Sequence, residues 1–140
     1  MIDITQQPLT EYHRRRVYDG FEKHAIASTG YNELFDPQSF IAMDGTTFAG
    51  SIVCARFWGA LHIKYVYVED AYRGQGLATQ LMNRAFDYGR ENNCAFAFVE
   101  TMSFQAIGFY EKMGFVLEFT RRGFAHGTSF HYLRKELLKE

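Results

Sequence analysis

The sequence predicts a mixed fold of the α+β class, built on a sheet that is mostly antiparallel. Three apolar segments, 40–43, 48–57 and 61–68, follow one another with only short turns between them, which indicates an antiparallel meander. The pattern then changes to helix, strand and helix over 77–113, and a strand reached through a helix requires a parallel crossover. With 140 residues, the chain is expected to form a single domain over 1–140.

The first elements are predicted from apolar spacing and from turn residues. A helix is expected over about 10–26, where apolar residues recur every four or five positions and Thr10 can cap the first turn. Ser28-Thr29-Gly30 is expected to lie in the loop that follows. Asp44-Gly45 is typical of a hairpin turn between the first two strands, and Trp58-Gly59 marks the break before the third.

The second half of the chain is expected to alternate helices with strands. A long helix starts at Leu77, with apolar residues every three or four positions, and Asn92-Asn93 closes it. The continuous apolar run 95–99 is typical of a strand buried on both faces. Ser103 is expected to cap a helix over about 104–113. Two closing strands, 115–120 and 129–133, and a short charged tail, Lys135 to Lys139, complete the chain.

Composition narrows the classes of function. The formal net charge of -1 argues against nucleic acid as a partner, since such domains are usually strongly basic. No apolar run approaches the length of about 18 residues that a membrane span needs. Cys54 and Cys94 lack the spacing of metal ligands or of a disulfide framework, so no metal is expected. The N-terminus resembles no secretory signal, and a cytoplasmic protein is expected.

The segment 68–79 carries the first chemical signal. A strand ends at Val68, and a loop containing Arg73, Gly74 and Gly76 leads directly into a helix. Glycines allow the backbone to approach a ligand closely, and a helix N-terminus offers unpaired N–H groups and the positive end of a dipole. The segment therefore predicts a site for a phosphate or pyrophosphate. The alternative is a tight strand-to-helix turn that binds nothing.

A second segment, from Ser103 to Phe115, contains a further motif that has to be considered together with the segment 68–79. Arg73, Gly76 and Ala78 match an Arg/Gln-x-x-Gly-x-Gly/Ala signature, and Ala106 is followed by Tyr-Glu-Lys-x-Gly-Phe at 110–115. With both motifs in this order, essentially the whole chain resembles the GNAT superfamily of acyl-CoA-dependent N-acetyltransferases. One position departs from the family pattern, because Ser103 stands where many members carry Asn.

The resemblance implies a cosubstrate, acetyl-CoA, and a place for it. The pyrophosphate of CoA would lie on the loop before the long helix, and the pantetheine arm would pair with the backbone of the preceding strand, as an added strand does. That pairing requires this strand to splay away from the parallel strand 95–99. The residues implied to bind the cofactor are Val66, Tyr67, Val68, Arg73, Gly74, Gln75, Gly76, Leu77, Ala78, Thr79, Ser103, Phe109 and Lys112.

The resemblance also implies direct attack of an amine on the thioester in a ternary complex. Tyr110 would be the general acid for the departing CoA thiolate, since phenols and thiolates are of similar basicity. The alternative for Tyr110 is that its side chain lies on a helix and only packs in the core. Glu100 is the favoured general base, with Glu69 and His62 as the other candidates. Each of them could equally be an ordinary strand or strand-end residue.

Three classes of function therefore stay open. The leading hypothesis is an enzyme that transfers an acetyl group from acetyl-CoA to a primary amine on a small molecule or a peptide. The first alternative is a non-catalytic acyl-CoA-binding or regulatory module on the same fold, since a fold does not determine a function. The second is an interaction domain whose glycine loop is only structural. The identity of the amine and the choice between monomer and homodimer are not predicted.

Overall fold

The structure is a computed structural model that describes residues 1–138 in two units, residues 1–34 and a larger unit that starts at Phe35. The first unit is built on α1, which spans Glu11–Thr29. The Thr10 hydroxyl accepts a hydrogen bond from the backbone N–H of His13 at 3.2 Å, as predicted for the cap. Gly30 ends the helix in the left-handed conformation, so Ser28 and Thr29 lie in the helix and not in the expected loop.

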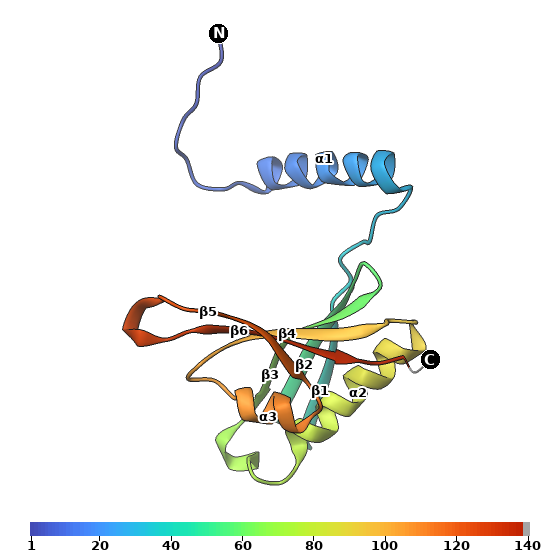
Figure 1. The fold of residues 1–140 in the computed structure, drawn as a ribbon, viewed down its shortest axis with the longest axis vertical. Coiled ribbons are helices and arrows are strands. Elements are labelled where there is room, and N and C mark those ends of the chain that lie inside the picture. The colour runs from blue at the N-terminus through green and yellow to red at the C-terminus, as the bar shows by residue number, and fades with distance from the viewer. Residues whose placement is uncertain (139–140) are drawn as a thin grey trace. The chain divides into compact units, whose positions relative to one another are not determined.

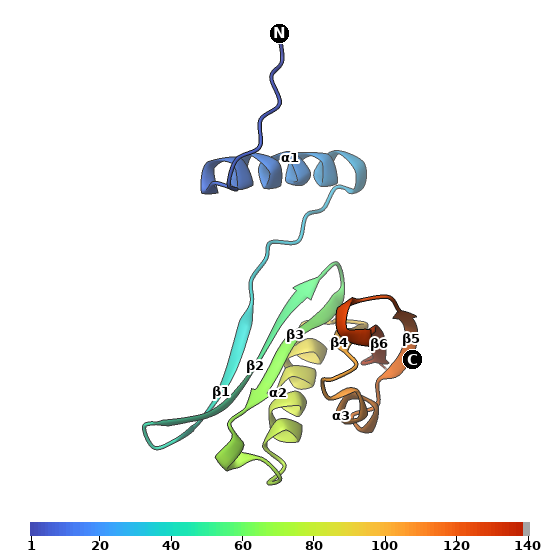
Figure 2. The same ribbon diagram turned by 90° about the vertical axis from the view of Figure 1, so that its left-hand side faces the viewer.

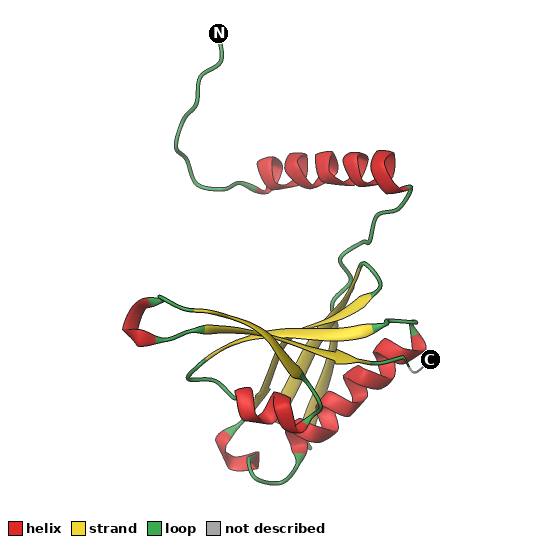
Figure 3. Cartoon of the chain, viewed as in Figure 1, coloured by secondary structure: helices red, strands yellow, loops and turns green. Residues whose placement is uncertain are grey.

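The second unit is a six-stranded sheet (Figures 1 and 3). The strand order is β1-β2-β3-β4-β6-β5, and β3 with β4 is the parallel pair, while all other neighbours are antiparallel. This topology confirms the predicted α+β class. The strands are β1 (Gln38–Asp44), β2 (Thr47–Phe57), β3 (Ala60–Val68), β4 (Phe96–Met102), β5 (Val116–Arg121) and β6 (Phe130–Glu136).

Two α-helices cover one face of this sheet, α2 (Leu77–Glu91) and α3 (Ile107–Lys112), as Figures 1 and 2 show. Two short 3-10 turns, η1 (Asp70–Tyr72) and η2 (Ala125–Gly127), lie in the loops. The core lies between the helices and the sheet, where burial of each large apolar side chain stabilises the fold by about 1.5–3 kcal/mol. Its largest fully buried members are Ile52, Leu61, Ile63, Met82, Leu133 and Val99. Within residues 1–138, no helix combines the length and the apolar character that a membrane span needs.

The parallel strands β3 and β4 pair over a short stretch only. Their register contains two pairs, Leu61 with Ala97 and His62 with Phe98. Beyond His62, β3 stays paired with β2 as far as Val68. β4 is paired with β6 along its other edge over its whole length, from Phe96 to Met102. Lys64 is an extra residue in β3 between the partners of Val53 and Cys54, and such a bulge bends and twists a strand. The predicted splay between these two strands is confirmed.

Several predicted boundaries are wrong. The second motif helix is shorter than 104–113, because α3 begins at Ile107 and Ala106 stands at its N-cap, so Ser103 is not the cap. The apolar strand 95–99 continues to Met102, which places Glu100 inside β4 and not at its end. The last strand runs on to Glu136 through pairing with β4, so the first residues of the predicted tail are strand. Lys139 lies outside the described residues.

The two cysteines lie in the core. Cys54 and Cys94 are both buried in the core cluster, and the structure joins neither of them in a disulfide. Burial raises the pKa of the Cys54 thiol to about 11, because the thiolate is poorly solvated there. The raised pKa disfavours the reactive thiolate form of Cys54.

Candidate active site

The loop between β3 and α2 is shaped by two glycines. Gly74 and Gly76 adopt φ values of 75° and 79°, which only glycine reaches without strain. Between β3 and these glycines, η1 turns the chain, closed by a hydrogen bond from the Tyr72 N–H to the Glu69 carbonyl at 2.9 Å. The loop therefore connects the splayed end of β3 directly to the start of α2.

Arg73 holds this loop against β3. Its Nε donates to the Val68 carbonyl at 2.9 Å, and its Nη1 lies 2.7 Å from Oδ1 of Asp70. The guanidinium also lies over the Tyr67 ring, 5.7 Å from the centroid. The resemblance places Arg73 among the residues implied to bind the cofactor, and in the structure two of its nitrogens hold the loop itself.

The N-terminus of α2 offers donors that no side chain satisfies. Gly76 is the N-cap, which has no side-chain cap hydrogen bond, and the first turn contains no acidic residue. The first intrahelical bond joins the Gln80 N–H to the Gly76 carbonyl at 3.1 Å, so the N–H groups of Leu77, Ala78 and Thr79 precede it. An anion placed here would meet both these donors and the positive end of the helix dipole.

His62 and Glu100 are brought together across the splay. His62 Nε2 lies 2.7 Å from Oε2 of Glu100, and the two side chains are half-buried. The His62 ring also stacks on Phe98, with centroids 4.5 Å apart and planes within 4° of parallel. Two of the three predicted base candidates therefore form one unit at the last residue pair that joins β3 to β4.

The third base candidate lies elsewhere. Glu69 follows β3, and its Oε2 accepts a hydrogen bond from the Tyr67 hydroxyl at 3.2 Å. It belongs with the loop that leads to α2 and not with the His62–Glu100 pair.

Tyr110 lies on the helical side of the sheet. It is 7% exposed and belongs to the core cluster, where its ring meets Phe109 and Phe115 edge to face. Burial raises the pKa of Tyr110 above the ordinary tyrosine value, because the phenolate would be poorly solvated. The phenol therefore keeps its proton at neutral pH, as a general acid must. His62 and Glu100 lie on the opposite face, since Glu100 and Phe98 alternate with the buried Val99.

Ser103 takes part in a network that the sequence did not predict. Its hydroxyl lies 2.9 Å from Nε2 of His131, whose Nδ1 lies 3.0 Å from the Thr120 hydroxyl. The Ser103 oxygen also accepts from the Ser129 N–H at 3.1 Å. Because both ring nitrogens of His131 are engaged, this network joins the end of β4 to β6 and leaves no free base. Residues 28 positions apart meet here, so sequence spacing gives no signal for it.

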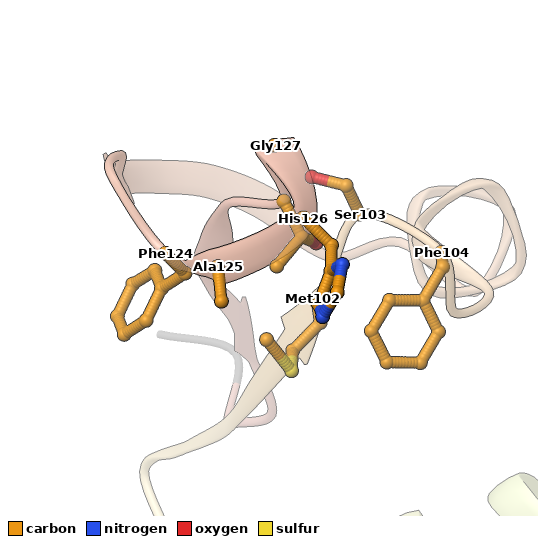
Figure 4. A pocket seen from close by; sticks show the side chains of 8 residues that line it. Met102, Ser103, Phe104, Phe124, Ala125, His126 and Gly127 are labelled. Carbon is orange, nitrogen blue, oxygen red and sulfur yellow. The ribbon is translucent and has the colours of Figure 1, made fainter.

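A pocket of about 790 Å³ opens beside Ser103. Figure 4 shows His126 close to Met102 and Ser103, with the rings of Phe104 and Phe124 on either side. The pocket joins the end of β4 and its loop to the segment 124–128 between β5 and β6. The implied cofactor residues 73–79 do not line it. His126 and Phe124 are not predicted from the sequence, because nothing in a loop between two closing strands indicates which strand end it reaches.

The remaining implied cofactor residues lie in the β3 strand and in α3. Val66, Tyr67 and Val68 form the part of β3 beyond its last pair with β4. Phe109 is half-buried against the core, and Lys112 is exposed in the last turn of α3. Among residues 1–138, no group of three or more His, Cys, Asp or Glu side chains is placed to hold a metal ion.

Comparison with known proteins identifies the family of this chain. The model of the acetyltransferase (GNAT) family matches residues 3–115. The chain belongs to this family. This match confirms the family that the two sequence motifs resemble.

Individual relatives agree with the family. A blasticidin-S acetyltransferase from Streptomyces morookaense is 38% identical over 90 residues, which span 64% of this chain and 66% of that protein. An acetyltransferase crystal structure from Agrobacterium tumefaciens superposes with a TM-score of 0.83 at 23% identity, covering 97% of this chain and 99% of that one. A protein assigned as a streptothricin acetyltransferase from Bacillus anthracis, solved with acetyl coenzyme A, gives a TM-score of 0.66 at 25% identity, covering 75% and 64%.

The raised pKa of Tyr110 predicts a pH-dependent effect on the stability of this GNAT protein. The unfolded state ionises first, near the ordinary tyrosine pKa of about 10, so this group stabilises the fold below that pH and its contribution is lost above it. Tyr110→Phe abolishes that loss. Urea unfolding at pH 8 and near pH 11 should show the variant gaining stability relative to the wild type at the higher pH. A difference in unfolding free energy that is the same at both pH values would contradict this.

Proposed function

We propose that this protein transfers an acetyl group from acetyl-CoA to a primary amine, by direct attack in a ternary complex. The observation that carries the proposal is the parallel pair β3–β4, which opens after two residue pairs beside the uncapped N-terminus of α2. The acetyl-CoA held by the streptothricin acetyltransferase of Bacillus anthracis adds support.

Acetyl-CoA would bind in two parts. Its pyrophosphate would accept hydrogen bonds from the N–H groups that begin α2, where the helix dipole favours a negative charge. Its pantetheine amides would pair with the backbone of β3 over Val66 to Val68, where β3 has parted from β4. Gly74 and Gly76 add no side chain to the loop between these two contacts, and the space beside each of them is open.

The chemistry needs one proton donor and one proton acceptor. The amine nitrogen forms a bond to the thioester carbon, and the carbon–sulfur bond breaks. Tyr110 would protonate the leaving thiolate, while the attacking nitrogen loses a proton to the His62–Glu100 pair on the open face of the sheet. Acid and base thus approach the thioester from opposite faces, through the gap between β3 and β4.

Small-molecule amines are the acceptors that this proposal favours. Two relatives carry the names of antibiotics, blasticidin S and streptothricin. The pocket beside Ser103 is lined largely by apolar side chains, with His126 as its ionisable member, so it suits an acceptor with an apolar or planar part next to its amine.

A non-catalytic acyl-CoA-binding module is the second candidate. The observation that favours it is the burial of Tyr110, because a phenol packed between Phe109 and Phe115 could serve the core alone. The two functions share cofactor binding and differ in turnover, so an assay for CoA release in the presence of blasticidin S, streptothricin, lysine or a peptide with a free N-terminus separates them.

Thr79 provides a matched test of the cofactor site. Thr79→Asp places a carboxylate in the exposed first turn of α2, where it repels a pyrophosphate but favours the helix by about 0.3–1 kcal/mol. Calorimetric titration should show acetyl-CoA binding weakened at least tenfold, with unchanged or slightly higher thermal stability. Thr79→Asn introduces a side chain of the same size as that of Thr79→Asp but without its charge. This variant should bind acetyl-CoA nearly as tightly as the wild type does. Equal affinities for the Asp and Asn variants would contradict the placement of the pyrophosphate.

Tyr110→Phe separates catalysis from binding. The substitution removes only the hydroxyl from a ring that stays packed against Phe109 and Phe115. Turnover should fall by about a hundredfold, the usual scale for loss of a general acid, while the affinity for acetyl-CoA stays within a factor of about three. Steady-state kinetics and calorimetry together measure both. An equal loss of affinity and turnover would assign Tyr110 to packing.

A further inference from the structure

We infer that His62 is the group that accepts the proton of the attacking amine, and that Glu100 is a positioning residue that orients the imidazole and balances its charge. The inference rests on the proposed acetyl transfer and names the base within it. It reverses the expectation from sequence, which favoured Glu100 as the direct base.

The contact between the two side chains is short and sheltered. His62 Nε2 and Glu100 Oε2 are 2.7 Å apart, and the side chains are 21% and 28% exposed. The ion pair between Arg134 and Glu136 on the same sheet has the same length, but its side chains are 37% and 65% exposed. Solvent therefore screens the His62–Glu100 contact less than it screens the Arg134–Glu136 pair.

The imidazole ring is held in one orientation. Phe98, which pairs with His62 in the parallel register, lies flat against it at 4.5 Å. Phe98 is itself braced by edge or tilted contacts with Phe57 and Phe96, both at 6.1 Å. With Nε2 directed at Glu100, the other ring nitrogen, Nδ1, has no hydrogen-bond partner among the residues that the structure describes. Nδ1 is thus the nitrogen available to a substrate.

Within residues 1–138, the neighbouring strands place no stronger partner beside either group. From β2, the register places Ala55 opposite His62, and from β6 it places Tyr132 opposite Glu100. Arg134 of β6 stands opposite Phe98, but its guanidinium lies 3.7 Å from the Phe96 centroid and binds Glu136 at 2.7 Å. On β3, Tyr65 is exposed, and the Lys64 ammonium lies over the Phe35 ring at 5.5 Å.

These contacts define the proton path. Nε2–H donates to the Glu100 carboxylate, which fixes the tautomer with a free lone pair on Nδ1. As the amine nitrogen bonds to the thioester carbon, it gives its proton to Nδ1, and the resulting imidazolium is stabilised by Glu100. The proton then leaves from Nδ1 to water, which restores the starting tautomer. The alternative path, in which Glu100 takes the proton itself, needs no histidine.

His62→Gln and Glu100→Gln distinguish the two paths. Under the inference, His62→Gln should lower kcat/KM by about a hundredfold or more, and Glu100→Gln should lower it by only about tenfold, since the amide oxygen still accepts from Nε2–H. Because the base must have lost its own proton before it can accept one from the amine, the acidic limb of the kcat/KM profile should move in His62→Gln and persist in Glu100→Gln. Added imidazole should restore activity to His62→Ala, whose cavity lies against Phe98.

Controls separate this inference from the proposed function. Acetyl-CoA affinity should stay at the wild-type value in each variant, each variant should remain folded at the assay temperature, and Glu136→Gln should leave the profile unchanged. If the wild type is active, and His62→Gln has little effect on kcat/KM while Glu100→Gln has a large one, the inference is overturned. The proposed function would then still stand. A wild-type protein that binds acetyl-CoA but acetylates none of the amines would overturn both.

Discussion

The parallel pairing of β3 and β4 ends after two residue pairs, and the rest of the site depends on that break. Buried backbone donors and acceptors need partners, so a gap inside a sheet is costly unless something occupies it. The bulge at Lys64 bends β3 away from β4, whose other edge is paired with β6 throughout. The gap thus exposes one strand edge beside the helix N-terminus, a combination suited to a ligand with amides at one end and phosphates at the other.

The same break divides the chemistry between the two faces of the sheet. Tyr110 lies among core side chains on the helical face, where burial keeps its phenol protonated. His62 and Glu100 meet on the other face, at the last residue pair before the strands part. A sheet without the gap would separate acid from base by a full layer of backbone. In the proposed reaction, the opening would admit a long cofactor and would place the proton donor and the proton acceptor on opposite sides of one thioester.

The sequence predicted those features that local patterns determine, namely the meander, the loop 68–79, α2 and the motif at Tyr110. The sequence did not predict the strand ends and side-chain contacts that depend on pairing between residues far apart along the chain. β4 and β6 extend past their apolar runs because they pair with each other, and that extension moved Glu100 into the strand. The contact between His62 and Glu100 spans 38 positions and follows from the parallel register, and Ser103 meets His131 in the same way across β4 and β6. Side-chain partners of this kind cannot be read from spacing along the chain.

Backbone hydrogen exchange in β3, with and without acetyl-CoA, is the most direct test that the open strand pair is the cofactor site. The account predicts that amides of β3 beyond His62 that point into the gap exchange quickly in the free protein and become protected when acetyl-CoA binds. Amides on the β2 side of the same strand should be protected in both states. Equal protection on both sides in the free protein, or no change in β3 on binding, would contradict the central claim.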